Sequence, residues 1–359
     1  MLNSAKLKNA GSRIAISAIA LVLSILVGAI IVAALGKDPI TVYSALFEGA
    51  FGGALSLTGT FNRMIPIVFA GLAIAVGQKC SVFNIGVDGQ ILIGSLISVY
   101  MGAFLNLPPI IHIPLTMVVG ALGGMLWSMV PALLNLKKNV SVVFSTIMMN
   151  YVAQYLCNFL IQKMPGYVSN KLATPNIQDS AAISNLFPTP WGINSGILIS
   201  LLAVVVIYIY VFRTRAGYDL RAAGFNRHAA RSAGINIKKN VFMAMMVSGL
   251  LAGFAGSTEV AGLTHCLVEN YAPGYMATGI AVAMLGQGNP FAILLASFLF
   301  AGMKNGAPLM QMKTGMSNQF VSIVQGLIIV FICSENFIRW IYIKMKTKKK
   351  VRENGNGSN

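Results

Sequence analysis

The sequence predicts an integral membrane protein built entirely of α-helices, and three observations support this. Hydrophobic residues make up 56% of the 359-residue chain and charged residues only 10%, whereas a soluble protein carries roughly a quarter charged residues. Apolar runs of about 20 residues, the length of a helix that crosses a bilayer, recur along the whole chain. The shorter alternating segments typical of a membrane β-barrel do not occur.

The apolar runs predict about ten transmembrane helices in a single bundle, some of them short or broken. The predicted spans are Arg13–Leu35, Phe61–Gln78, Val87–Leu105, Ile110–Leu134, Val140–Ile161, Gly192–Phe212, Val241–Gly262, Tyr275–Gly286, Pro290–Met303 and Asn318–Ile343. The eighth and ninth are short, and they could instead form one long broken span.

The distribution of positive charge predicts that both termini are cytoplasmic. With ten spans and an inner N-terminus, twenty of the 26 Lys and Arg residues fall in inner segments, as the positive-inside rule requires. The predicted organisation is a basic N-terminus over residues 1–12, a transmembrane domain over 13–343 and a basic tail over 344–359 facing anionic lipid. Topology thus accounts for the net charge of +17 without a nucleic-acid partner.

Local signals predict details of the helices. Asp38 and Pro39 are typical of a helix start, and the apolar residues that follow would lie on one face of a helix at the membrane interface: Val42, Leu46, Phe47, Ala50 and Phe51. Small residues spaced four apart predict close helix packing. These pairs are Gly120 with Gly124, Gly249 with Gly253, and Ala252 with Gly256.

Several kinds of catalytic site are missing from the sequence. It contains no P-loop, no HExxH and no GxSxG motif, and its three histidines stand alone. The four cysteines are far apart, which disfavours a disulfide or metal framework. We therefore expect no catalytic residue, no metal site, no cofactor bound by this chain and no enzymatic activity.

Polar residues interrupt the apolar pattern at Cys80–Gln90, between two predicted spans. The carboxylate of Asp88 lies near the membrane boundary, where a charge is expected to face protein or water. The surrounding glycines permit a re-entrant turn that lines a cavity. The alternative is an ordinary inner turn in which Asp88 caps the helix that follows it.

A second interruption, Gly279–Pro290, again places Gly, Gln and Asn in an apolar context. Its GIAVA sequence resembles GLAIA in Gly71–Gln78. Interrupted segments in both halves of a transporter point to its central pathway. The match is short, however, and both segments would run in the same direction, so it does not establish a duplication. The isolated Glu259 could line the same path or end its span.

The inner loop 213–240 carries seven Lys and Arg residues against one Asp and contains a capped helix. Asn226 is a good N-cap, Arg227–Ala233 a short helix, and Gly234 a good residue to end it. Two turns are too few to be stable alone, so we expect the helix to pack against neighbouring protein. The outer loop 162–191 is long enough to meet a docking protein. For either loop, a plain solvated loop is the alternative.

Six motifs resemble, in order, the permease subunits of bacterial ABC importers, in the branch that contains ribose, branched-chain amino acid and nucleoside permeases. They are FNIGVDGQILIG, STIMMNYVA, YDLRAAGFNRHAARSAGINIKKN, SGLLAGFAGSTEV, GIAVAMLGQGNP and VQGLIIVF. The resemblance covers about residues 37–335. The forms FNIGVDGQ and STIMMNYVA look closest to the nucleoside permeases.

The resemblance implies a bacterial cytoplasmic-membrane importer with several partners. These are a second permease, which we expect to be a paralogue, cytoplasmic subunits that bind ATP and Mg, and an extracellular substrate-binding lipoprotein. It also implies that Gly224–Gly234 holds the coupling helix that contacts the ATPase, with its contact residues among Gly224, Asn226, Arg227, Ala230, Arg231 and Gly234. His228 departs from the Pro or acidic residue common at its position, which puts the helix start in question.

The function expected is a permease subunit that forms the pathway for nucleosides. The expected pathway residues are Phe83, Asn84, Asp88, Gln90, Asn150, Gln287 and Asn289, where Phe83 could stack on a base and the amides could bind its edge. Ribose-type sugars or branched-chain amino acids are alternative substrates. A stand-alone secondary transporter, coupled to ions through Asp88 or Glu259, is the alternative of another class.

Overall fold

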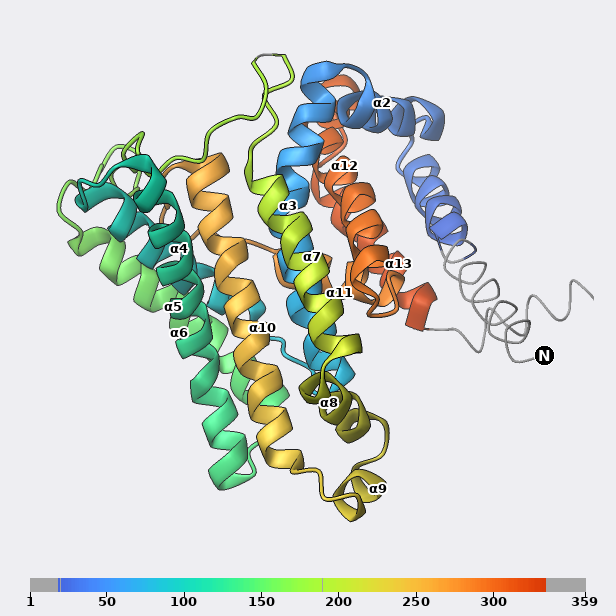
Figure 1. Ribbon diagram of the computed structural model, residues 1–359. Helices are drawn as coiled ribbons and strands as arrows, with labels where there is room; N and C mark the ends of the chain where they lie inside the picture. Colours follow the sequence, from blue (N-terminus) through green and yellow to red (C-terminus); the bar gives the residue numbers. More distant parts are fainter. Residues whose placement is uncertain (1–18, 20, 189, 334–359) are drawn as a thin grey trace, which may run out of the picture. The chain divides into compact units, whose positions relative to one another are not determined.

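The computed structural model describes residue 19 and residues 21–188 and 190–333. All the regular secondary structure of this part of the chain is helical, and its loops contain only isolated β-bridges. After an apolar helix at Leu21–Ala34, the elements are α2 Pro39–Phe51, α3 Ala54–Lys79, α4 Val87–Phe104, α5 Pro109–Lys138, α6 Val142–Lys163, α7 Gly196–Arg213, α8 Arg215–Phe225, α9 Arg227–Ser232, α10 Ile237–Glu259, the π-helical η1 Val260–Thr264, α11 Tyr275–Leu285, α12 Pro290–Thr314 and α13 Gln319–Cys333 (Figure 1).

Six of the described helices are long and apolar enough to cross a membrane: α3, α4, α5, α7, α10 continued by η1, and α12. Shorter apolar helices lie at Leu21–Ala34, Tyr275–Leu285 and Gln319–Phe331. The prediction of an all-helical membrane protein is therefore confirmed. The count of ten spans and the inner position of both termini stay predictions. The basic segments 1–12 and 344–359 lie outside the described residues.

The chain forms two compact units, residues 46–309 and residues 1–45 together with 310–359. In the smaller unit the Tyr43 hydroxyl donates to the Ile25 carbonyl (2.9 Å), and the Tyr43 ring packs on Phe320. The backbone amide of Thr41 donates to Asp38, which confirms the predicted cap of α2. On the predicted apolar face of α2, Val42 and Ala50 are buried and Phe47 is 67% exposed, and the position of this helix at the membrane interface stays a prediction.

The larger unit is centred on a close contact between α5 and α10. A β-carbon added at Gly124 would lie 2.6 Å from the Gly249 carbonyl oxygen, and one at Gly253 would lie 2.7 Å from the Ala121 backbone. Only glycine lets two helix backbones approach this closely. The predicted role of the small residues in packing is confirmed here.

The chain re-enters the bundle between α3 and α4. After α3 ends, the Val82 amide donates to the Gly77 carbonyl (3.0 Å), so the chain runs back alongside the helix. The Asn84 side chain then donates to the Ser248 hydroxyl, which itself donates to the carbonyl of Ala73. Ala73 lies six residues before the end of α3, or about 9 Å at 1.5 Å per residue. Helix α4 therefore begins inside the bundle, as the re-entrant alternative predicts.

Helix α11 also begins inside the bundle. The Lys79 ammonium donates to the Gln287 carbonyl (3.2 Å), which places the end of α11 beside the end of α3. Its eleven residues reach only about 16 Å from there. The two similar sequence motifs pack against each other, since Gly279 lies against Ala70 of α3 and Gly71 against Val282 of α11. The two similar motifs therefore form the contact between α3 and α11.

The two ends of the larger unit differ. Helices α8 and α9 lie at one end, which we call the α9 end, and the segment between α6 and α7 lies at the other, the loop end (Figure 1). The loop is well anchored: the amides of Thr174 and Ile177 donate to the carbonyls of Leu267 and His265 (both 2.9 Å). It therefore does not have the character of a plain solvated loop.

Candidate functional site

A polar network lies inside the larger unit at the start of α11. The Glu259 carboxylate is only 7% exposed and accepts hydrogen bonds from the hydroxyls of Tyr275 (2.7 Å) and Tyr271 (3.1 Å). The Lys304 ammonium lies 4.5 Å from the centre of the Tyr275 ring and interacts electrostatically with Glu259 and Asp88. We call Asp88, Glu259, Tyr271, Tyr275 and Lys304 the central network. Glu259 also immediately precedes the π-helical η1, a distortion frequent at functional sites.

Asp88 connects the two helices that begin inside the bundle. It stands in the first turn of α4, but its carboxylate accepts a hydrogen bond from the Met276 amide of α11 (2.8 Å). A carboxylate is favourable there because the first amides of a helix lack partners and carry partial positive charge. The alternative in which Asp88 caps the helix following it is therefore wrong, since it caps α11, a helix far along the chain.

Asn84 and Gln90 form a buried pair behind the re-entrant segment. Each is 1% exposed, and the Asn84 amide nitrogen donates to the Gln90 side-chain oxygen (2.9 Å). Asn150 of α6 joins the same region by donating to the Ile85 carbonyl (2.8 Å) and accepting from the Gly89 amide (2.9 Å). These three amides are bonded to protein groups and fix the position of the segment before α4.

The other predicted pathway residues lie at the α9 end. Phe83 is 37% exposed and lines a cavity of about 480 Å³ together with Arg227 and Arg231. Gln287 sits in the α11–α12 turn with a φ of 51°, and the Asn289 side chain accepts from the Phe291 amide, as an N-cap of α12 does. The sequence-predicted set is thus divided among the central network, the buried amides and the α9 end.

Four members of the central network were absent from the predicted set, although the sequence had singled out one of them, Glu259, as a residue that could line the path. The sequence signal that could have found Lys304 is a cation within an apolar stretch, which usually marks function. The predicted span Pro290–Met303 stopped just before this lysine and so left it outside the apolar stretch. Helix α12 continues to Thr314, so Lys304 lies well inside a helix. Tyr271 and Tyr275 give no comparable signal.

Helix α9 has the predicted caps at both ends. The Asn226 side chain accepts from the amides of His228 (3.0 Å) and Ala229 (3.1 Å), so His228 does not displace the helix start. Gly234 has a φ of 79°, and the amide of Ile235 donates to the Ala230 carbonyl (2.9 Å). This is the Schellman arrangement that ends many helices. Within the helix only Ala230 is buried, which leaves the rest of its surface exposed.

The corner between α8 and α9 contacts the turn that starts the re-entrant segment. A β-carbon on Gly224 would lie 2.1 Å from the Lys79 carbonyl oxygen. The Ser81 hydroxyl donates to the Gly224 carbonyl (2.7 Å), and the Arg227 guanidinium donates to the Ser81 carbonyl (3.5 Å). Nearby, Phe225 is 95% exposed. The corner therefore combines an exposed surface with a tight internal attachment.

At the loop end, Glu269 links two loop segments. Hydrogen bonds from the Tyr167 hydroxyl and then from the Gln162 amide lower the pKa of its carboxyl below the usual value. The same contact raises the pKa of the Tyr167 hydroxyl. Elsewhere, Cys80 and Cys157 are buried free thiols and Cys266 is also unpaired.

Residues 56–333 match the family described as "Branched-chain amino acid transport system / permease component". The chain belongs to this permease family. With six helices long and apolar enough to cross a membrane, the permease is a multi-pass membrane protein. No solved structure matches it.

The permease is similar over nearly its whole length to proteins named for nucleosides. It is 34% identical to guanosine ABC transporter permease protein NupP of Bacillus subtilis (strain 168), over 94% of this chain and 98% of that protein. It is 32% identical to nucleoside ABC transporter permease protein NupB of Lactococcus lactis, over 96% and 97%. A glucose ABC transporter permease protein, TsgB13 of Haloferax volcanii, is 29% identical over 87% and 85%.

The relatives come in pairs. The permease is also 26% identical to the second nucleoside permease of that Lactococcus lactis, NupC, and 24% identical to the second guanosine permease of Bacillus subtilis, NupQ. In both organisms two similar permeases thus carry the same substrate in their names.

Proposed function

We propose that the chain is one permease subunit of an ATP-driven ABC importer and forms part of the pathway for nucleosides. The similarity over nearly the whole of two relatives named for guanosine and nucleosides supports this substrate. The polar network inside the bundle supports a transport role, because buried ionisable groups in membrane proteins are costly and usually functional.

The proposed assembly contains a second permease, cytoplasmic ATP-binding subunits that hold ATP and Mg, and an extracellular substrate-binding lipoprotein. The paired relatives support a paralogue as the second permease. In this assembly the α9 end faces the cytoplasm of a bacterial cell and the loop end faces outward. The density of Lys and Arg around α8 and α9 supports that orientation.

The contacts of Gly224 suggest how the ATPase drives transport. The ATPase contacts Asn226, Arg227, Arg231 and Gly234 and moves the α8–α9 corner. The expected contact at Ala230 is wrong, because that side chain is buried within this chain. Because the corner is packed on Lys79, the movement reaches the re-entrant segment and the end of α11. Asp88 carries the same movement to the start of α11. Access to the pathway then alternates through displacement of the re-entrant segment and α11 together.

The same geometry divides the proposed pathway residues by role. Asp88 and the other members of the central network meet the substrate inside the bundle, where tyrosine hydroxyls and charged groups suit ribose hydroxyls. Phe83, Gln287 and Asn289 lie where the substrate leaves at the α9 end. Asn84, Gln90 and Asn150 shape the pathway by holding the segment before α4.

The substrate is tested by uptake of radiolabelled guanosine in cells with and without the gene. We expect uptake to depend on the gene and to be inhibited by excess unlabelled guanosine but not by ribose. Inhibition by ribose, or by a branched-chain amino acid, would move the assignment to that substrate and leave the permease family unchanged.

A stand-alone ion-coupled transporter is the second candidate, because Asp88 and Glu259 are two carboxylates inside the bundle that both interact with the cation of Lys304. The two mechanisms separate in liposomes. The importer requires its partner subunits and ATP for guanosine uptake. Uptake by this chain alone, lost when an ion gradient is collapsed, would support the second candidate instead.

Glu259→Gln is expected to lower guanosine uptake by about tenfold to a hundredfold, because it removes the charge that accepts two tyrosine hydrogen bonds and faces Lys304. Tyr275→Phe should lower uptake less, since it removes one donor. Uptake and ATPase rates are compared in the reconstituted transporter, after copurification of all subunits. Glu269→Gln is the matched control, because this half-buried carboxylate at the loop end also accepts a hydrogen bond from a tyrosine. Normal uptake by Glu259→Gln would remove the central network from the pathway.

A further inference from the structure

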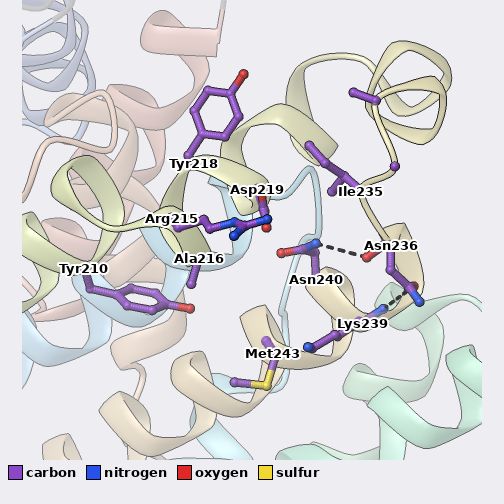
Figure 2. Close-up of a pocket in the computed structure, with 12 residues that line it drawn as sticks. Tyr210, Arg215, Ala216, Tyr218, Asp219, Ile235, Asn236, Lys239, Asn240 and Met243 are labelled. Carbon is purple, nitrogen blue, oxygen red and sulfur yellow. Dashed lines mark hydrogen bonds between the residues drawn. The ribbon is translucent and has the colours of Figure 1, made fainter.

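A second polar site lies beside α9, outside both the central network and the surface of α9. A cavity of about 750 Å³ opens between the end of α7, the first turns of α8 and the start of α10. Figure 2 shows Arg215 and Asp219 from α8, Lys239 and Asn240 from α10, and Tyr210 from α7 around it. The transport mechanism proposed above uses none of these side chains.

The cavity favours an anion. Arg215 and Lys239 are exposed, and neither side chain donates a hydrogen bond to another residue in the described part of the chain, so both cations are available. One carboxylate, Asp219, lies with them. Asn236 caps α10 by accepting from the Lys239 amide (3.0 Å), so the positive end of that long helix adds to the field of the two cations.

The cavity lies at the end of an exposed apolar surface on helix α7, of the kind that contacts lipid. Helix α7 is the most apolar of the six candidate spans and the least buried within the chain. Its exposed side chains include Leu202, Val206 and Ile209, and the next residue, Tyr210, lines the cavity. Two tyrosines, Tyr210 and Tyr218, thus flank the cavity, as aromatic residues commonly do at a membrane boundary.

We propose that this cavity binds the phosphate headgroup of an anionic phospholipid whose acyl chains lie along α7. Arg215 and Lys239 would hold the phosphate, as basic pockets at the ends of membrane helices do. Gly234 and Ile235, which end α9, line the same cavity. A bound headgroup therefore steadies the connection between α9 and α10, and membrane composition would regulate coupling. The position of the cavity at the inner leaflet rests on the proposed orientation of the permease. The lipid proposal does not depend on which substrate the permease carries.

The test uses the purified assembled transporter, titrated with fluorescent phosphatidylglycerol in detergent. We expect phosphatidylglycerol to bind and phosphatidylcholine not to compete. The double variant Arg215→Gln with Lys239→Gln should weaken binding by about tenfold or more. The reason is that each of the two cations contributes a similar share of the binding free energy of an anionic headgroup. The control Lys163→Gln with Lys171→Gln removes two exposed cations at the loop end and should bind normally. Size-exclusion profiles and copurified ATPase confirm that each variant folds and assembles.

Three results would overturn the proposal. Unchanged phosphatidylglycerol binding by the double variant would place the lipid elsewhere. Equal competition by inorganic phosphate or glycerol 3-phosphate would mean that the cavity binds free phosphate. Binding to the isolated permease that disappears in the assembled transporter would mean that the ATPase covers the cavity. Guanosine uptake in proteoliposomes is measured in parallel, so failure of the lipid proposal is distinguished from failure of the substrate assignment.

Discussion

Gly224→Ala is expected to abolish most ATP-driven uptake while leaving the permease in the membrane. The new β-carbon would lie 2.1 Å from the Lys79 carbonyl oxygen and 3.0 Å from the backbone of Cys80. Neither is the end of a flexible side chain, so the α8–α9 corner must move away. Overpacking of this kind costs about 1–3 kcal/mol, enough to displace the corner. Uptake and copurification of the ATPase measure the effect.

Gly53→Ala is the matched control for that substitution. It lies in extended backbone before α3, and an added β-carbon there meets no atom within 4 Å. Its uptake should equal that of the unmodified permease. Normal coupling in Gly224→Ala would show that the contact with Lys79 does not transmit movement, and the mechanism would lose its first step.

Gly124→Ala is expected to have the largest effect on stability. Its β-carbon would meet the Gly249 carbonyl oxygen and the Gly253 α-carbon, both at 2.6 Å. Helices α5 and α10 would have to separate along their most intimate contact, at a cost of about 3 kcal/mol. The measurements are the yield of monodisperse protein after solubilisation and the Tm of the purified transporter.

Gly123→Ala, at the neighbouring residue, is the control that separates the backbone contact from crowding by side chains. An added β-carbon there would lie 2.4 Å from Ile97, but the atom it meets is the Cδ1 at the end of a flexible side chain. Ile97 can change rotamer, so the Tm should fall much less than in Gly124→Ala. Equal losses in the two variants would mean that helix crowding in general, and not the backbone contact, limits stability.

Local sequence signals predicted the elements that depend on local chemistry. The caps of α2 and α9 follow from the residues at their ends, and glycines four residues apart mark α5 and α10 as closely packed helices without showing that they pack on each other. These features depend on one or two turns of chain. Hydropathy similarly located the helices, although the ends of α3, α10 and α12 differ from prediction by several residues.

The central network depends on contacts that no local signal contains. Asp88 was expected to line the pathway or, as the alternative, to cap its own helix, but its partner amide is on Met276, 188 residues away. Likewise, the Asn84 and Gln90 amides suggested substrate contacts because nothing in the sequence shows that they bond to each other. Which polar residue faces protein and which faces a path is decided by packing between distant segments.

The double attachment of α11 sets a limit on the length of the chain that faces it. Lys79 bonds to Gln287, two residues after the end of α11, and Asp88 bonds to its first turn. The segment 80–87 between these two residues must therefore span the same distance as helix α11. A single residue inserted between positions 80 and 87 would leave one attachment out of register, although the same insertion in a surface loop would be harmless. Variation in length is consequently expected to be excluded from this short stretch more strictly than variation in residue type.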